Sequence, residues 1–231
     1  MTDPVTLTWA GTRDGARRFF ALSLFIVPFG VAFGVAAVES GLTPLQAVIM
    51  SAAVFTAMAQ FAALEFLVEP IAYLSLAIIV FTLSARHIIM GAALSPWVNQ
   101  LPLAKRCLVL TPLTDATFAD AQIRLRDGRG DLGLILGGGL LFWFTWCWST
   151  ALGAYGGDLL GDLRAFGFGV VMLSFFAATA LDQTRRFPRL VWPVLIAIGI
   201  SILTLPYLPT GWNIILAALV GGVLSLVFHH E

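Results

Sequence analysis

The stretch FFALSLFIVPFGVAFGVAAV, residues 19–38, carries no charged side chain. A helix needs about 20 apolar residues to cross the hydrocarbon core of a bilayer, so this stretch predicts a transmembrane helix. Three arginines precede it, and it is too long for the hydrophobic region of a signal peptide. We therefore expect the helix to be retained, with residues 1–18 as a cytoplasmic segment before it.

Similar apolar stretches recur along the chain. Further single spans are predicted at residues 40–64, 71–93, 132–157 and 165–181. The stretch 190–228 is too long for one span and contains a turn-forming cluster at 205–211, so it predicts a helical hairpin. Hydrophobic residues make up 59% of the chain and charged residues only 11%, which is too little polar surface for a soluble domain. The sequence predicts an all-α, polytopic membrane protein with a single transmembrane domain over residues 1–231.

The segment 103–123 is ambiguous because charges interrupt its apolar sequence. The interrupting residues are Lys105, Arg106, Pro112, Asp115 and Asp120. The segment fits either an amphipathic helix on the membrane surface or a broken span that lines a polar cavity. Counting it as a span places most loop arginines on the cytoplasmic side, as the positive-inside rule requires. We therefore expect about eight transmembrane helices, within a range of six to eight, some of them broken, and a cytoplasmic N-terminus.

The third span contains the adjacent pair Arg86 and His87. Ionisable groups inside a membrane are costly and are functional candidates by default. Arg86 fits either a clamp for a substrate carboxylate or an internal ion pair with Asp115 that holds helices together. His87 fits either a proton relay, because imidazole titrates near neutral pH, or a packing neighbour that bonds a carbonyl group.

Asp115 follows a predicted helix break. Pro112 lacks the N–H of a helical hydrogen bond, and neighbouring threonines such as Thr114 can bond the freed backbone groups. A carboxylate beside a broken membrane helix is a common arrangement for an ion or substrate site. The sequence therefore makes Asp115 and Thr114 candidate site residues.

The first two spans also contain polar or irregular positions. Pro28 predicts a kink, and Gly30 with Gly34 forms a small-xxx-small pattern that favours close helix packing or an open backbone beside a ligand. Gln60 needs hydrogen-bond partners in an apolar environment. It fits either a bond to another helix or a contact with substrate.

Several function classes lack support in the sequence. Lys and Arg together balance Asp and Glu at 13 each, which argues against nucleic acid as a partner. No HExxH, GxSxG, Walker A or CxxC motif is present, and Cys107 and Cys147 have no ligand spacing for a metal. We expect no enzymatic activity, no metal and no cofactor.

Four motifs in order resemble the AzlC family, also called the LIV-E or YgaZ family. They read PFGVAFG at 28–34, FTAMAQF at 55–61, SARH at 84–87 followed by a Leu-x-Pro, and LTDATF at 113–118. The chain departs from the family pattern at Thr56, Ser84, Ala116 and Gly169, where the family usually has Ala, Asn, an acid and an acid.

The resemblance implies the large subunit of a branched-chain amino acid exporter in the bacterial inner membrane. It implies a small substrate of the Leu, Ile, Val or Met type and a short AzlD-type membrane subunit as partner, with proton coupling as the preferred energy source. The alternative is a structural or regulatory membrane subunit, or a passive permease for another small organic solute. Association into a homo-oligomer stays open.

The hypothesis for transport assigns a role to each candidate residue. Arg86 holds the substrate carboxylate, Asp115 faces its ammonium group or carries the coupling proton, and Gln60 gives a directional hydrogen bond. Pro28 and Gly30 shape the helix break. The remaining candidates are His87, Ser84 and Thr114 as polar neighbours and Phe29, with Phe33 and Phe61, as apolar walls.

Overall fold

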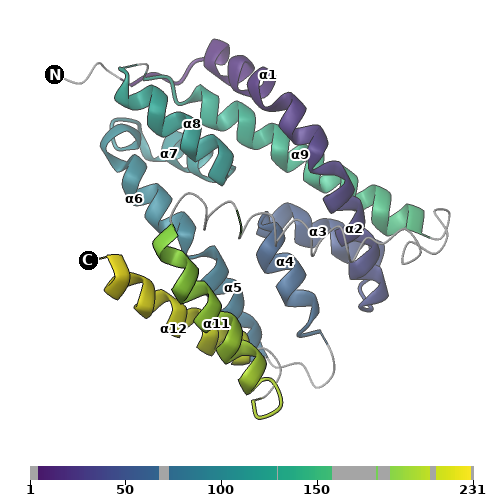
Figure 1. Ribbon diagram of the computed structural model, residues 1–231. Coiled ribbons are helices and arrows are strands. Elements are labelled where there is room, and N and C mark those ends of the chain that lie inside the picture. Colours follow the sequence, from purple (N-terminus) through teal and green to yellow (C-terminus); the bar gives the residue numbers. More distant parts are fainter. Residues whose placement is uncertain are drawn as a thin grey trace. The chain divides into compact units, whose positions relative to one another are not determined.

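The computed structural model describes residues 5–67, 73–128, 130–157, 181, 188–208 and 212–229. Within these residues the chain is helical, and the one β-type pairing is an isolated bridge between Thr6 and Asp131 (Figure 1). This confirms the all-α prediction. The predicted span 165–181 and the departure at Gly169 lie outside the described residues, apart from Leu181.

The chain divides into two compact units. The first unit contains Met1–Gln60 and Phe81–Leu159, and the second contains Phe61–Val80 and Leu160–Glu231. The first unit includes the candidate site residues except Phe61, which belongs to the second unit. The prediction of a single transmembrane domain therefore stays a prediction.

The first span is a bent pair of helices, α1 (Trp9–Phe25) and α2 (Val27–Glu39). Thr8 caps the start of α1 by accepting a hydrogen bond from the Gly11 amide, so the helix begins well before the apolar stretch. The axis bends by 55° at Ile26. Pro28 lies in the first turn of α2, where its missing N–H costs nothing, which explains why the break falls just before it. The predicted kink is present.

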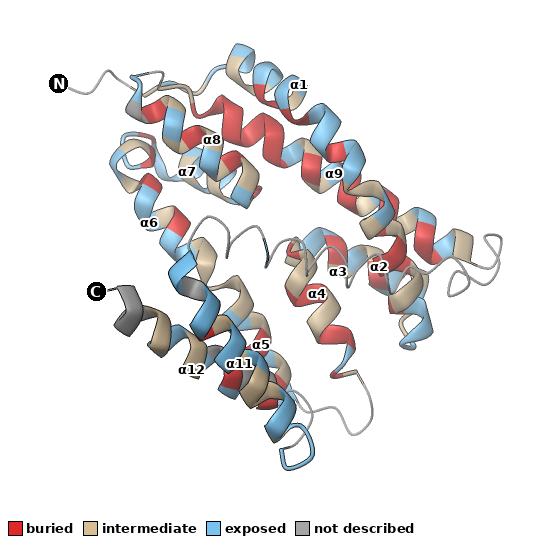
Figure 2. Cartoon of the chain, in the orientation of Figure 1, coloured by how far each residue is buried: buried red, intermediate tan, exposed pale blue. Residues whose placement is uncertain are grey.

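Helix α9 (Gly133–Gly156) is the core of the first unit, and buried residues follow one another along it (Figure 2). Both α1 and α2 pack along it in the same direction: Gly30 lies against Ser149, and Gly34 against the Thr150 carbonyl. A Cβ atom at either glycine would overlap these α9 atoms. The small-xxx-small pattern is therefore a helix-packing surface.

Three more pairs of short helices complete the first-unit segments. They are α3 (Pro44–Val54) with α4 (Ala57–Leu64), α5 (Tyr73–Ser84) with α6 (Arg86–Val98), and α7 (Leu103–Leu110) with α8 (Asp115–Arg126). The α4 and α5 helices cross the boundary between the two units. The breaks within these pairs fall at 55–56, 85 and 111–114.

The segment 103–123, for which a surface helix and a broken span were both open, forms the two helices α7 and α8. The Val5 amide donates to Gln100 Oε1, just before α7, at 3.1 Å. The Thr6 amide donates to the carbonyl of Gly130, just after α8, at 2.7 Å. Both ends of the pair therefore meet the same short N-terminal segment, and the pair folds back on itself. Pro112 permits the reversal because it interrupts the helical hydrogen bonds.

In the second unit, α11 (Val191–Thr204) and α12 (Trp212–His229) pack side by side (Figure 1). The Asn213 amide of α12 donates to Ser201 Oγ of α11 at 3.1 Å, and Gly221 lies beside Ala197. These contacts run in opposite directions along the two helices, so the predicted hairpin is present. A short 3₁₀ helix, η2 (Pro188–Leu190), precedes it.

Large apolar side chains cover much of the outside, including Phe20, Ile89 and Phe144, each more than half exposed. Such a surface is unfavourable in water and favourable in lipid. By length and composition, Tyr73–Val98 and Gly133–Gly156 are long enough to cross a membrane, and the bent α1–α2 pair is a third candidate, among the described residues. The chain is thus a helical membrane protein.

Candidate functional site

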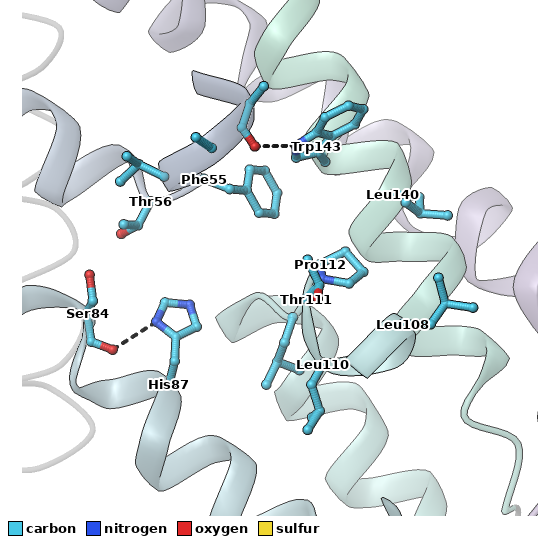
Figure 3. Close-up of a pocket in the computed structure, with 14 residues that line it drawn as sticks. Phe55, Thr56, Ser84, His87, Leu108, Leu110, Thr111, Pro112, Leu140 and Trp143 are labelled. Atoms are coloured by element: carbon cyan, nitrogen blue, oxygen red, sulfur yellow. Dashed lines mark hydrogen bonds between the residues drawn. The ribbon is translucent and has the colours of Figure 1, made fainter. Parts of the chain in front are cut away.

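A cavity of about 590 Å³ opens in the first unit where three helix breaks meet beside α9 (Figure 3). We call it the break cavity. Its lining residues are Ala52, Ala53, Val54, Phe55, Thr56, Ser84, His87, Leu108, Leu110, Thr111, Pro112, Leu113, Leu140 and Trp143. The lining is mostly apolar, with a few hydroxyl groups and one imidazole, and its volume lies within the range of about 300–1,000 Å³ typical of small-molecule sites.

The break between α3 and α4 forms one wall of the cavity. Phe55 adopts φ of +37°, a left-handed conformation that is uncommon for a bulky residue. Trp143 of α9 donates its indole N–H to the Ala52 carbonyl at 3.0 Å, which satisfies a backbone group near the end of α3. The next residue, Thr56, is only 6% exposed, and its hydroxyl group has no hydrogen-bond partner.

The break between α5 and α6 contributes Ser84 and His87. His87 Nδ1 lies 3.1 Å from the Ser84 carbonyl oxygen. A carbonyl only accepts, so in this contact Nδ1 is the donor and carries a proton. The carbonyl bond is the packing arrangement expected as one alternative for His87. His87 also lines the cavity, and the other alternative, a proton relay, stays a prediction.

The break between α7 and α8 contributes Thr111 and Pro112. The Thr111 hydroxyl donates to the Cys107 carbonyl at 2.8 Å. Thr114 starts α8 with a capping box, in which the side chains of Thr114 and Thr117 each bond the backbone amide of the other. Thr114 thus caps a helix and is not part of the cavity wall.

Arg86 and Asp115 pair with each other. Arg86 Nη1 lies 2.9 Å from Asp115 Oδ2, and their side chains are 35% and 63% exposed. Nη1 also lies 3.9 Å from Met58 Sδ in the first turn of α4, while Nε is buried without a hydrogen-bond partner. Neither residue belongs to the cavity lining. Arg86 and Asp115 therefore form the internal ion pair that was one of the two alternatives for Arg86. The Nε donor of Arg86 takes no part in it.

Gln60 lies in a buried network of hydrogen bonds across three helices. Its Nε2 donates to Ser51 Oγ at 3.2 Å, and its Oε1 accepts from the Trp146 indole at 2.8 Å. Ser51 Oγ lies 2.8 Å from Thr150 Oγ1, which extends the network. Gln60 therefore has the inter-helix role among its two alternatives, and it fixes the first turn of α4 against α9.

The remaining candidates lie away from the break cavity. Pro28 is exposed on α2, Gly30 packs on α9, and Phe29 lies 5.8 Å from Phe25 between ring centres. None of them lines the cavity. Phe33 is buried and stacks on Trp146 at 6.1 Å. The break cavity is thus lined by the second, third, fourth and fifth of the predicted stretches, and the candidates of the first stretch do not line it.

Sequence reasoning did not identify a charged cluster between α1 and α8. Arg18 bonds Asp120 at 2.6 Å, Arg124 bonds Asp14 at 3.0 Å, and Arg124 Nε lies 3.2 Å from Asp120 Oδ2. The Asp120 side chain is only 15% exposed. Arg18 and Asp120 are 102 residues apart, and Asp14 and Arg124 are 110 apart, so no local sequence pattern indicated this cluster.

The cavity residues Phe55, Thr56 and Trp143 were also missed as site residues. The departure from the family pattern at Thr56 was the one signal that pointed to this position. Among the described residues, no group of three or more His, Cys, Asp or Glu side chains is placed to hold a metal ion.

Comparisons with known proteins match the part of the chain that contains the break cavity. The AzlC protein family matches residues 21–160, which contain every lining residue of the break cavity. The chain is 25% identical over 220 residues to the inner membrane protein YgaZ of Escherichia coli K12, covering 92% of this chain and 88% of that protein. It is 28% identical over 217 residues to an uncharacterized membrane protein of Archaeoglobus fulgidus, covering 92% and 93%. No solved structure matches the chain.

Family and relatives agree with the apolar helices and the exposed apolar surface described above. Together they indicate a membrane protein whose role is related to transport. The match to the family covers more than half of the sequence. The chain is a multi-pass protein of the inner membrane and belongs to the AzlC family.

Proposed function

We propose that this protein is a secondary transporter that exports small apolar amino acids of the Leu, Ile, Val or Met type. The observation that carries the proposal is the break cavity, a space of about 590 Å³ with an apolar lining and a few polar groups at broken helices. Broken membrane helices expose backbone groups that can bind a zwitterion, while apolar walls select the side chain. Phe55, Leu140 and Trp143 form the wall suited to a branched aliphatic group.

The proposed topology has a cytoplasmic N-terminus and a helix number within the range of six to eight. The ion pairs of α1 with α8 support it, because they bring Arg18 and Arg124 into one cluster. The α7–α8 fold-back favours the lower part of the range. We propose that residues 1–231 work as one transporter domain.

Arg86 and Asp115 act at the edge of the cavity in this proposal. A substrate that carries both a carboxylate and an ammonium group can compete for each member of the pair, so binding and opening of the pair are coupled. Asp115 or His87 carries the coupling proton.

The proposed partners are the substrate, the lipid bilayer and a small AzlD-type membrane subunit, with self-association as a further arrangement. The protein has no enzymatic activity and needs no cofactor in this proposal. The runner-up is a structural or regulatory membrane subunit, or a passive permease for another small solute. One observation favours the structural alternative: Arg86 and Asp115 already neutralise each other.

The test is efflux of labelled leucine, isoleucine, valine and methionine from dipeptide-loaded cells that express the chain alone or with its small subunit. We expect efflux that stops when the proton gradient is dissipated. Efflux that ignores the gradient contradicts proton coupling and favours a passive permease. No efflux of any of the four amino acids, with the protein present in the membrane, contradicts the proposed function.

A further inference from the structure

We infer that the start of α4, together with the Thr56 hydroxyl group, is the subsite that binds the substrate carboxylate in the break cavity. The inference rests on the proposed function and names the part of the site that recognises the charged end of the substrate. It gives the carboxylate a second contact besides Arg86, on the cavity wall itself.

The first observation is the unused hydroxyl group. Thr56 lines the cavity, is 6% exposed and has no hydrogen-bond partner for Oγ1. A buried hydroxyl without a partner costs free energy, so native structures rarely keep one without a reason. A threonine at the start of a helix normally bonds an amide of the first turn. This one does not, and its donor and acceptor have no partner among the described residues.

The second observation is the helix start itself. The first hydrogen bond of α4 runs from the Gln60 amide to the Thr56 carbonyl at 3.0 Å. The amides of Ala57, Met58 and Ala59 precede that bond and have no partner within the helix. The first turn contains no acidic residue, so the positive end of the helix dipole is not neutralised from within α4. A helix start of this kind is an anion-binding site.

A cation also lies near the start of α4, although its charge is shared with Asp115 at 2.9 Å. The Arg86 guanidinium reaches the first turn of α4, where Nη1 lies 3.9 Å from Met58 Sδ. Its Nε is buried without a hydrogen-bond partner. Thr56 and Arg86 thus carry two unused buried groups at neighbouring breaks. No acidic side chain lines the cavity among the described residues.

The subsite also orients the rest of the ligand. Figure 3 shows Thr56, Ser84 and His87 on one side of the cavity and Pro112, Leu110 and Leu140 on the other. A carboxylate at Thr56 therefore leaves the apolar side chain facing the leucines. The ammonium group then lies within the part of the cavity that Ser84 and His87 line.

The test compares Thr56→Val with Thr56→Ser in the purified full-length protein, assembled with its small subunit. Binding is measured for leucine, for 4-methylpentanoate, which lacks the ammonium group, and for leucinamide, which lacks the carboxylate. We expect Thr56→Val to weaken leucine and 4-methylpentanoate by about tenfold or more, the effect of a lost hydrogen bond to a charged group, and to leave leucinamide unchanged. Thr56→Ser keeps the hydroxyl and stays near wild type.

Thr111→Val is the matched control. Thr111 lines the same cavity, but its hydroxyl already bonds the Cys107 carbonyl, so its loss does not change the preference for a carboxylate. If wild type binds leucine and Thr56→Val binds it equally well, the subsite is wrong and the proposed function stands. An equal loss for all three ligands in Thr56→Val also contradicts it. If wild type binds neither leucine nor 4-methylpentanoate, the proposed function fails as well.

Discussion

Two helix breaks face the break cavity with opposite chemistry. At the start of α8, Thr114 and Thr117 cap each other's amides and Asp115 lies in the first turn, so the helix start is both hydrogen-bonded and neutralised. At the start of α4, the Thr56 hydroxyl has no partner and the first turn has no acid. The difference teaches that a helix break is a binding element only when the chain leaves its end groups unsatisfied. The first break is closed on itself and the second is open to a ligand.

The largest expected effect comes from removing the cation between the two breaks. Arg86→Ala is expected to abolish leucine efflux while the protein still reaches the membrane, because both the positive charge near α4 and the partner of Asp115 are lost. Efflux and membrane abundance are measured together. Normal export by this variant contradicts any role of Arg86 in binding the carboxylate.

The double variant Arg86→Asp with Asp115→Arg separates transport from helix bridging. It keeps an ion pair but reverses its direction across the two breaks. We expect thermal stability to return towards the wild-type value while efflux stays absent. Recovery of both favours the structural alternative.

A smaller effect on leucine binding is expected from giving the start of α4 an acid like the one at the start of α8. Ala57→Asp places an acid in the first turn of α4, at the position that Asp115 has in α8. The new charge repels a bound carboxylate, so leucine affinity falls by about tenfold or more while leucinamide binding is retained. Ala57→Asn is the control, because asparagine has about the size of aspartate but carries no charge. Equal losses in the two variants indicate steric damage instead of repulsion.

The fixed position of α4 can be tested through Gln60. Gln60→Leu leaves the buried Trp146 indole N–H without its acceptor, while Ser51 keeps its bond to Thr150, and the loss costs about 1–3 kcal/mol of stability. A fall in the melting temperature of the purified protein is expected, with weaker leucine binding as a secondary result. The variant Gln60→Leu with Trp146→Phe removes both partners and recovers part of the stability. An unchanged melting temperature in Gln60→Leu contradicts the anchoring role.

The smallest effect is expected at the closed break. Thr114→Ala removes the cap of α8 and costs about 0.5–2 kcal/mol. Thermal unfolding measures this loss. Leucine affinity is expected to stay within about twofold of wild type, since Thr114 does not line the cavity. A large loss of leucine affinity in Thr114→Ala contradicts the comparison, because the start of α8 would then also take part in binding.

The breaks also differ in how far the sequence predicts them. Pro28 and Pro112 mark two breaks directly, because proline removes a helical hydrogen bond wherever it lies. No proline or glycine marks the break at Phe55 and Thr56. It depends on non-local contacts, above all the bond from Trp143 to the Ala52 carbonyl and the anchoring of Gln60 by Trp146. The residues of the cavity wall at this break could therefore not be inferred from local patterns.

The fold-back of α7 and α8 was hidden for a related reason. Loop charges favoured a crossing, whereas the reversal is visible only in the bonds of Val5 and Thr6 to the two flanking loops. The ionisable residues Arg86, His87 and Asp115 were identified from the sequence, because ionisable side chains are rare within apolar spans. Which of them touch the cavity and which pair with each other depends on helix packing.

The packing of α1 and α2 on α9 has a consequence for biosynthesis. Thr6 and Gly130, whose backbones are joined at one end of this contact, are 124 residues apart in the chain. During translation the first two helices therefore enter the bilayer long before the helix that buries their glycine surface is made. Until α9 emerges, that surface is exposed to the surroundings of the nascent helices, whereas α9 covers it in the finished fold. The order of synthesis thus gives this surface a period of exposure that the finished fold no longer provides.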